Sequence, residues 1–346
     1  MEKWKELLGR SIVDAATLKK ALNINEKEAG KVIENYPMRI NPYLLKLIGK
    51  KKSPIWRQSV PDTKEIIDQR GEIDPLKEEA YSPVHGLIHR YKDRVLLYVS
   101  NICASYCRFC TRKRKIGFEY ITLGEADFEK AFQYIAEHVE IRDVIFSGGD
   151  PLMLDDGVIE RYLERLKKIK HIEIVRIDTR APSSLPQRIT PELCEMLKKY
   201  DPIYLLTHFN HPSEITEESK KACEMLADAG IVLGNQSVLL KGVNDNAKIL
   251  KKLGEELLKI RIRPYYLYIP DAVLGTYHFR VSIHRALKIM RSLIGFTSGL
   301  AIPKLIIDLE KGGGKLPLTP KYVVRKSGKD YTFRNFENKL FHYHDV

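Results

Sequence analysis

The stretch RVLLYVSNICASYCRFC, residues 94–110, joins an apolar run directly to three cysteines. Its first part, RVLLYVS, is rich in Val and Leu, which is typical of a buried strand. Cys103, Cys107 and Cys110 follow in a C-x3-C-x2-C spacing. Three thiols this close together, in a chain with an odd total of five cysteines, indicate a metal site in a reducing compartment rather than a disulfide framework.

The rest of the chain repeats the pattern of an apolar run followed by a helical stretch. The apolar runs cover 94–100, 143–149, 172–178, 202–208, 232–240 and 262–269, and the helical stretches between them cover 125–139, 156–169, 191–200, 214–230 and 247–260. Such alternation predicts βαβ units and a parallel sheet, hence the α/β class. Because no Rossmann GxGxxG follows the first run, a partial (β/α)6-type barrel is favoured over a doubly wound sheet. In a barrel, the chemistry lies at the carboxyl ends of the strands.

Regions on both sides of the barrel differ from it. Residues 18–24 and 27–36 have helical periodicity, whereas the prolines that follow and the polar composition predict an irregular segment over 50–80. We therefore expect three parts: an N-terminal helical region (1–85), the barrel (86–310) and a C-terminal extension (311–346).

Composition limits the class of protein. The chain has 346 residues, 44% of them hydrophobic and 30% charged, which is an ordinary globular balance. It has no apolar run long enough to span a membrane and no apolar signal segment at its start, so we expect a soluble, cytoplasmic protein. The net charge of +13 would suit nucleic acid, anionic cofactors or acidic proteins. No block of five like charges occurs, which favours a lysine-rich, ion-paired surface over nucleic-acid binding.

An iron–sulfur cluster is the metal site that the cysteines suit best. A 4Fe–4S cluster normally takes four thiolates, so three thiolates leave one iron open to an exogenous ligand. A structural zinc would need a fourth ligand, and the nearby His89 precedes the strand rather than the loop. Three unrelated buried cysteines are the remaining alternative.

Two glycine-rich stretches are further candidates. SGGDP (147–151) ends the second apolar run, where glycines let the backbone approach a ligand closely, although an ordinary strand-to-helix turn has the same composition. GGGK (312–315) follows the apolar run 304–308 and is not a P-loop, because Leu316 stands where Ser or Thr is required. Lys315 suits a Schiff base with pyridoxal phosphate (PLP), and a solvated glycine turn is the alternative.

Together these motifs resemble the lysine 2,3-aminomutase family of the radical S-adenosylmethionine (radical SAM) superfamily. The resemblance runs collinearly from about Tyr36 to about residue 336. It rests on the segments HRYKDRVLL, CASYCRFCTRKR, SGGDPL, THFNHP, NQSVLLKGVND, RPYYLYIPD and IIDLEKGGGKLPLTPKYV. It implies a radical SAM barrel, a 4Fe–4S cluster, SAM, PLP and an isomerase that exchanges an amino group between C2 and C3 of L-lysine.

The resemblance also implies roles for individual residues. Cys103, Cys107 and Cys110 match the cluster ligands, and Lys315 matches the lysine that carries PLP. The other matched positions are Tyr91 and Arg94 for the PLP phosphate, Gly148, Gly149, Asp150, His208 and Gln236 for SAM, Arg112 for the substrate carboxylate, and Asp271 and Asp308 for the substrate ammonium. For single residues, a surface Arg, a satisfied core polar group or a helix cap is the alternative.

Partners and alternatives follow from the same resemblance. It implies an electron donor such as flavodoxin or ferredoxin and a homo-oligomer. The longer family members continue into a cysteine-containing tail that holds a structural zinc, whereas here no cysteine follows Cys223, so a short member is expected. The alternatives are the same chemistry on glutamate or ornithine, or a basic iron–sulfur protein that binds or modifies RNA.

Overall fold

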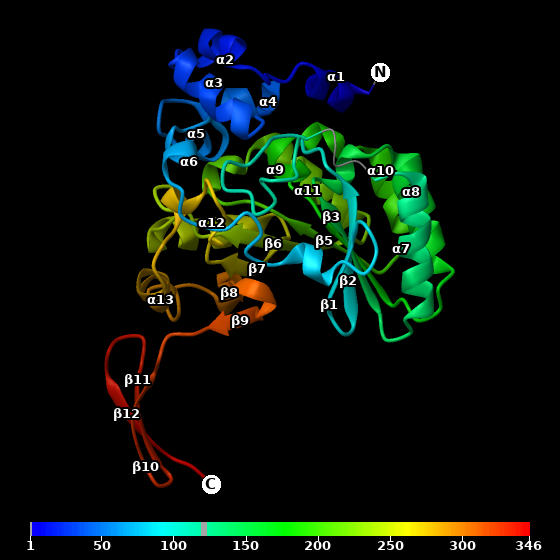
Figure 1. The fold of residues 1–346 in the computed structure, drawn as a ribbon. Coiled ribbons are helices and arrows are strands. Elements are labelled where there is room, and N and C mark those ends of the chain that lie inside the picture. Colours follow the sequence, from blue (N-terminus) through cyan, green and yellow to red (C-terminus); the bar gives the residue numbers. More distant parts are fainter. Residues whose placement is uncertain (1, 119–122) are drawn as a thin grey trace.

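The computed structural model describes residues 2–118 and 123–346 and contains one large curled sheet (Figure 1). Its nine strands lie side by side in chain order. They are β1 (Leu87–Tyr91), β2 (Arg94–Ser100), β3 (Asp143–Gly148), β4 (Ile174–Asp178), β5 (Ile203–Thr207), β6 (Val232–Val238), β7 (Arg263–Tyr268), β8 (Lys304–Leu309) and β9 (Gly314–Leu318). Strands β2 to β8 are parallel, whereas β1 and β9 are antiparallel to their neighbours. The predicted partial barrel is confirmed.

Amphipathic helices connect the parallel strands and cover the outside of the sheet (Figure 1). They are α7 (Glu125–Glu137), α8 (Asp156–Lys167), α9 (Ala181–Ser184), α10 (Pro191–Lys198), α11 (Glu217–Asp228), α12 (Ala247–Lys259) and α13 (Ile283–Arg291). Their apolar faces and the strands form two clusters, a large one that includes Phe146 and Leu205 and a smaller one around α13 that includes Leu267, Ala286 and Leu305. Among the described residues, no helix is both long and apolar enough to cross a membrane.

The N-terminal region is more regular than its composition predicted. It contains α1 (Lys3–Gly9), α2 (Ala15–Leu22), α3 (Glu26–Asn35), α4 (Pro42–Ile48), α5 (Pro54–Ser59) and α6 (Lys64–Ile67). The prediction of an irregular segment over 50–80 was wrong for α5 and α6. Pro54 begins a helix instead of ending one, because the first helical position needs no N–H donor, and the Ser53 side chain caps that helix.

Glu65 of α6 ties this region to the cysteine loop. It is fully buried and pairs with Arg108, whose Nε lies 3.0 Å from Oε1, and with Lys113. Burial raises the pKa of Glu65, but the charges of Arg108 and Lys113 outweigh that effect and hold the pKa below its usual value. Arg108 also donates to the Pro37 carbonyl at 2.8 Å. One buried carboxylate thus fixes a loop whose residues 101–118 form neither helix nor strand.

Two further segments complete the architecture. We call residues 71–82 the strap, which ends in the short helix η1 (Glu78–Tyr81). The Glu72 N–H donates to the Ala272 carbonyl after β7 at 2.8 Å. The Lys311 N–H donates to the Pro75 carbonyl of the strap at 2.7 Å. The second is a three-stranded antiparallel sheet of β10 (Val323–Ser327), β11 (Asp330–Arg334) and β12 (Leu340–His344), which projects from the barrel (Figure 1).

Removal of the Glu65 charge is the first test of this arrangement. Glu65→Gln should lower the free energy of unfolding by about 3–5 kcal/mol, because Arg108 and Lys113 lose their buried counter-charge. Urea unfolding of the protein without cofactors measures the change. The control Glu34→Gln, at an exposed position of α3, should stay within about 0.5 kcal/mol of the wild type. Equal stabilities for the two variants would contradict the role given to Glu65.

Candidate active site

The three clustered cysteines lie in the loop that follows β2. All three line one cavity of about 320 Å³ at the carboxyl ends of the strands. Burial raises the pKa of Cys110 to about 11 and that of Cys103 well above its usual value, so these two free thiols are protonated at neutral pH. A bound metal would displace these protons.

The three cysteine thiols lie around the cavity and do not converge on one position where a single metal ion could bind. Within residues 2–118 and 123–346, no three His, Cys, Asp or Glu side chains are close enough together to ligate a single metal ion. An iron–sulfur cluster is held by thiolates distributed over its irons, and three thiols around a cavity fit that donor set. The residues present therefore fit a cluster better than a lone zinc ion.

Glycines at the end of β3 bring this strand against the cysteine loop. A Cβ on Gly148 would lie 2.6 Å from the Ser100 carbonyl oxygen, and one on Gly149 would lie 2.5 Å from that of Ile102. Gly148 also has a φ of +113°, which side chains rarely adopt. These glycines are needed for close packing of two protein segments, in addition to any approach of a ligand.

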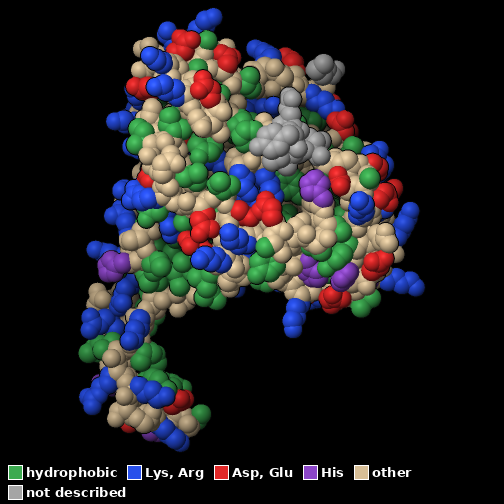
Figure 2. All heavy atoms as spheres, in the orientation of Figure 1, with side chains coloured by type: hydrophobic (Ala, Val, Ile, Leu, Met, Phe, Trp, Pro, Cys, Tyr) green, Lys and Arg blue, Asp and Glu red, His purple; other side chains and the backbone are tan. Residues whose placement is uncertain are grey.

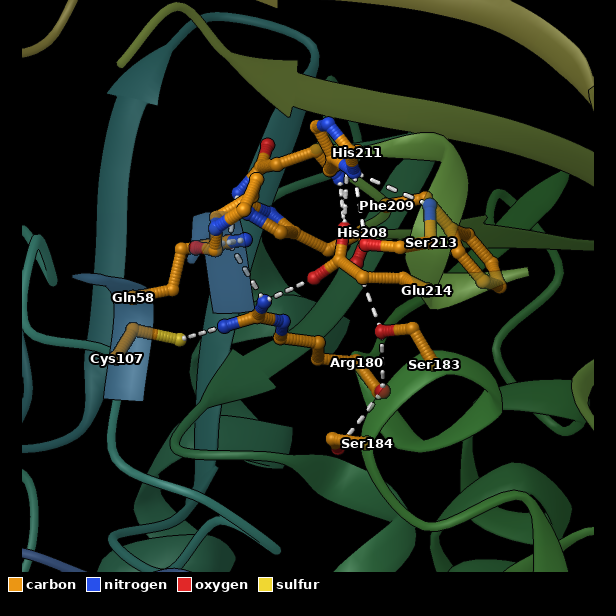
Figure 3. A network of polar contacts seen from close by, with 12 residues as sticks. Gln58, Cys107, Arg180, Ser183, Ser184, His208, Phe209, His211, Ser213 and Glu214 are labelled. Atoms are coloured by element: carbon orange, nitrogen blue, oxygen red, sulfur yellow. Dashed lines mark hydrogen bonds and ion pairs between the residues drawn. The ribbon is translucent and has the colours of Figure 1, made fainter. Parts of the chain in front are cut away.

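Arg180, which follows β4, connects the cysteine loop to the opposite wall (Figure 3). Its guanidinium donates to the Cys107 sulfur at 2.7 Å, to Gln58 Oε1 at 2.9 Å and to Glu214 Oε1 at 2.6 Å. His208 lies beside this network and stacks on Phe109 with ring centroids 5.7 Å apart. Burial lowers the pKa of His208 well below its usual value, so the ring is neutral.

A second cavity, of about 340 Å³, adjoins the first. Its lining includes the predicted phosphate residues Tyr91 and Arg94, together with Arg90, Arg176 and Lys315. Nε of Arg90 is buried and has no hydrogen-bond partner among the described residues. Several guanidinium groups with donors to spare suit a phosphate-bearing ligand, and PLP has that chemistry.

Lys315 lies where the two cavities meet, because it lines both of them. It stands in β9 opposite Asp308 of β8, and its Nζ is 3.3 Å from Asp308 Oδ2. Its backbone N–H donates to Tyr91 Oη at 3.1 Å. Gly312 precedes it with a φ of +83°, and a Cβ there would lie 2.3 Å from Tyr81 Oη of the strap. The glycine turn therefore places an amine at the junction of the cavities.

The two predicted carboxylates share a wall of the first cavity but differ in their partners. Asp308 lies between two cations, with Oδ1 3.0 Å from Arg90 Nη2 and Oδ2 near Lys315. Asp271 forms no ion pair within the described chain, and burial, reinforced by the charge of Asp308, raises its pKa to about 7. An additional cation at this wall would be attracted by both carboxylates.

Arg112 occupies the middle of the site but is already paired. Its Nε donates to Glu78 Oε1 of the strap at 2.9 Å, and its Nη1 donates to Ser147 Oγ at 3.2 Å. A ligand carboxylate can therefore bind only the N–H groups of Arg112 that are still free, unless Glu78 moves away. Asp150 is also engaged: it accepts hydrogen bonds from Thr179 Oγ1 (2.6 Å) and from the backbone N–H of Arg180 (2.9 Å).

The structure thus brings all the sequence-predicted residues to one pair of cavities. It also adds residues that the sequence did not reveal, namely Glu78, Arg90, Arg176, Asp178, Arg180 and Tyr268. Tyr268 donates to Gln236 Oε1 at 2.8 Å. Burial raises the pKa of Asp178 to about 6. The only signal in the sequence was that Asp178 and Arg180 stand at a strand end.

Comparison with known proteins shows what this chain is similar to. The chain matches the family models "Radical SAM superfamily" over residues 97–253 and "Lysine-2,3-aminomutase" over residues 290–345. It is 45% identical to an L-lysine 2,3-aminomutase of Fusobacterium nucleatum over 98% of this chain and 81% of that protein. It is 47% identical to an L-lysine 2,3-aminomutase of Methanococcus maripaludis (99% and 80%) and 45% identical to a glutamate 2,3-aminomutase of Clostridioides difficile (99% and 82%).

The raised pKa of Asp271 gives a pH-dependent test of the site. The folded-state pKa of about 7 exceeds the unfolded value of about 3.9, so the wild type loses stability as the pH rises between these values. Asp271→Asn removes this loss. Its stability gain over the wild type should grow from pH 4 to pH 7 by at most about 4 kcal/mol and then level off.

Urea unfolding without cofactors, at pH 5 and at pH 8, measures this gain. Asp308→Asn is the matched comparison: it takes away the carboxylate that Arg90 and Lys315 share, so it should destabilise the protein at both pH values. A gain for Asp271→Asn that is the same at pH 5 and pH 8 would contradict the raised pKa.

Proposed function

We propose that this chain, which belongs to the lysine 2,3-aminomutase family of radical SAM enzymes, interconverts L-lysine and β-lysine by moving an amino group between C2 and C3. The observation that carries the proposal is the position of Lys315. This amine lies between a cavity lined by three cysteines and a cavity lined by arginines, and it is paired with a buried carboxylate. The glutamate-specific relative shows that identity alone does not separate substrates.

The cofactors divide the two cavities between them. When bound, the 4Fe–4S cluster and SAM supply the radical that abstracts hydrogen from C3, and PLP delocalises the unpaired electron while nitrogen migrates. Cys103, Cys107 and Cys110 would ligate the cluster, and SAM would bind beside it, where Gly148, Gly149, Asp150, His208 and Gln236 line the same cavity. Arg90, Tyr91 and Arg94 would hold the phosphate of PLP, and Lys315 would supply the amine that binds it covalently.

Asp308 and Asp271 select the far end of the substrate. In the structure the Lys315 ammonium is beside Asp308. With Lys315 bound to PLP, Asp308 would lose this partner, and the ε-ammonium of the substrate would take its place. Asp271 then gains a cation nearby, which lowers its pKa from about 7 and favours the ionised form. A substrate with a side-chain carboxylate would instead be repelled by Asp308, and its charge would raise the pKa of Asp271 further, so its binding would be disfavoured.

Arg112 holds the substrate carboxylate at the near end. Glu78 orients its guanidinium through Nε, and Ser147 fixes Nη1, so the remaining donors are aimed before the substrate arrives. A guanidinium fixed in this way loses little conformational freedom on binding. The strap lines both cavities through Leu76 and Glu78. We place the reaction in the cytoplasm, with a one-electron donor protein such as flavodoxin or ferredoxin.

A substrate panel tests the proposed function. Reconstituted protein with SAM, PLP and reductant should act on lysine first, and ornithine should be disfavoured by about 1–3 kcal/mol because its ammonium falls one methylene short of the carboxylates. Glutamate should give no detectable product. Chromatography of the β-amino acids measures all three. Asp271→Asn should weaken turnover of lysine more than cleavage of SAM, and turnover of glutamate at the rate of lysine would contradict the assignment.

Covalent attachment of PLP gives an independent test. Borohydride reduction of the PLP-loaded protein, followed by peptide mapping, should place the pyridoxyl group on Lys315. The Lys315→Ala variant should lose the label and the absorbance band of the Schiff base. Lys304 at the start of β8 is an exposed lysine on the same strand pair and serves as the internal control. A label on Lys304 in the wild type would reject the assignment.

A further inference from the structure

The wall outside the cysteine loop is formed by two segments that contact the loop directly, α5 and the loop after β6. In α5, the Gln58 carbonyl accepts a hydrogen bond from the Arg108 backbone N–H at 2.9 Å, and Gln58 Oε1 accepts from Arg180, which contacts Cys107. In the loop after β6, Leu240 and Val243 pack against Phe109 and Cys107. These two segments therefore separate the cysteines from solvent on this side of the molecule.

The outer side of this wall is basic. Lys50, Lys51 and Lys52 precede α5 and are exposed, as is Lys241 in the loop after β6. Arg57 joins the two segments: its Nε donates to the Lys52 carbonyl at 3.2 Å, and a Cβ on Gly242 would lie 3.4 Å from its guanidinium. We call these five cations the basic patch. Figure 2 shows Lys and Arg side chains along the side of the molecule where α5 lies in Figure 1.

The charges of the basic patch are not neutralised within the described chain. None of its five side chains pairs with a carboxylate of residues 2–118 or 123–346. The nearest acids along the sequence have other partners, since Asp62 lies 3.9 Å from Lys64 and Asp245 lies 3.1 Å from Arg285. By contrast, the cations inside the wall, Arg108 and Arg180, pair with Glu65 and Glu214. Unpaired cations outside this wall leave a positive field on this face.

We propose that the basic patch is the docking surface for an acidic one-electron donor protein. The inference rests on the proposed function, which requires a reduced cluster behind this wall. One electron leaves the reduced cofactor of the donor and enters the cluster, so the donor is oxidised by one electron and the cluster is reduced by one, with no bond made or broken. Complementary charge steers the encounter and sets its orientation, and the transfer distance is short because Arg57 and Lys241 adjoin Gln58 and Leu240, which pack at the cysteine loop.

Charge reversal on the patch tests the proposal. In the reconstituted holoprotein, Lys51→Glu/Lys241→Glu should weaken binding of reduced flavodoxin, used as the acidic probe, by at least tenfold at low salt. It should slow cluster reduction by flavodoxin to a similar degree. Calorimetry measures the binding, and the loss of the visible absorbance of the cluster measures reduction. Reduction by dithionite, which needs no protein docking, should stay within about twofold of the wild type.

The matched control separates docking from overall charge. Lys168→Glu/Lys170→Glu makes the same charge change at two exposed lysines before β4, at the amino end of the barrel opposite the cysteine loop. It should leave flavodoxin binding and reduction within about threefold of the wild type. Equal losses in both variants, or no loss in the patch variant, would overturn the proposal.

Two further outcomes remain decisive. If Lys51→Glu/Lys241→Glu does not retain iron, Lys51→Gln/Lys241→Gln replaces it, and unchanged binding in that variant would reject the patch. Binding and cluster reduction are measured without substrate. A chain that accepts electrons through the patch but converts no amino acid would therefore refute the proposed function and leave the docking surface intact.

Discussion

Buried charge pairing is the constraint on which the site depends. The cysteine loop, over residues 101–118, has no helix or strand of its own, yet it must hold three thiols in fixed positions. Its arginines and the arginine after β4 are fixed by carboxylates from other segments: Arg108 by Glu65 of α6, Arg112 by Glu78 of the strap, and Arg180 by Glu214. Removing one member of such a pair leaves an uncompensated buried charge, so the loop position is strongly specified.

The same principle organises the second cavity, where cations exceed their partners. Arg90 and Lys315 share Asp308, and Arg176 pairs with Asp143 at 2.8 Å. An anionic ligand would complete the pairing, whereas at the neighbouring wall burial and the charge of Asp308 raise the pKa of Asp271, and Asp271 has no ion-pair partner within the described chain. The protein alone therefore lacks an anion in the second cavity and a cation beside Asp271. A substrate that carries an ammonium at one end and is linked to PLP through its amine at the other would supply both.

Sequence reasoning predicted what depends on local pattern. Apolar runs identified strands β2 to β8, and the cysteine spacing and the GGGK turn identified the two ends of the site. It missed Glu65 and Glu78, because their partners lie 43 and 34 residues away and nothing in a polar stretch marks a glutamate as buried. Sequence reasoning also wrongly took Pro54 as a helix breaker. A proline that ends a helix cannot be told from one that begins a helix unless the capping residue before it, here Ser53, is recognised.

The strap has a consequence for how the enzyme exchanges its contents with solvent. Its main-chain bonds to the barrel are few, through Glu72 and Pro75, while the strands beneath it are held by continuous ladders. Opening the strap also separates Glu78 from Arg112 and Arg114, but it leaves the strand ladders intact, so it costs less free energy than opening the sheet. Amide hydrogen exchange would then be fast in residues 71–82 and slow in β3 to β6, and entry and exit of small molecules would proceed by this local opening while the barrel stays folded.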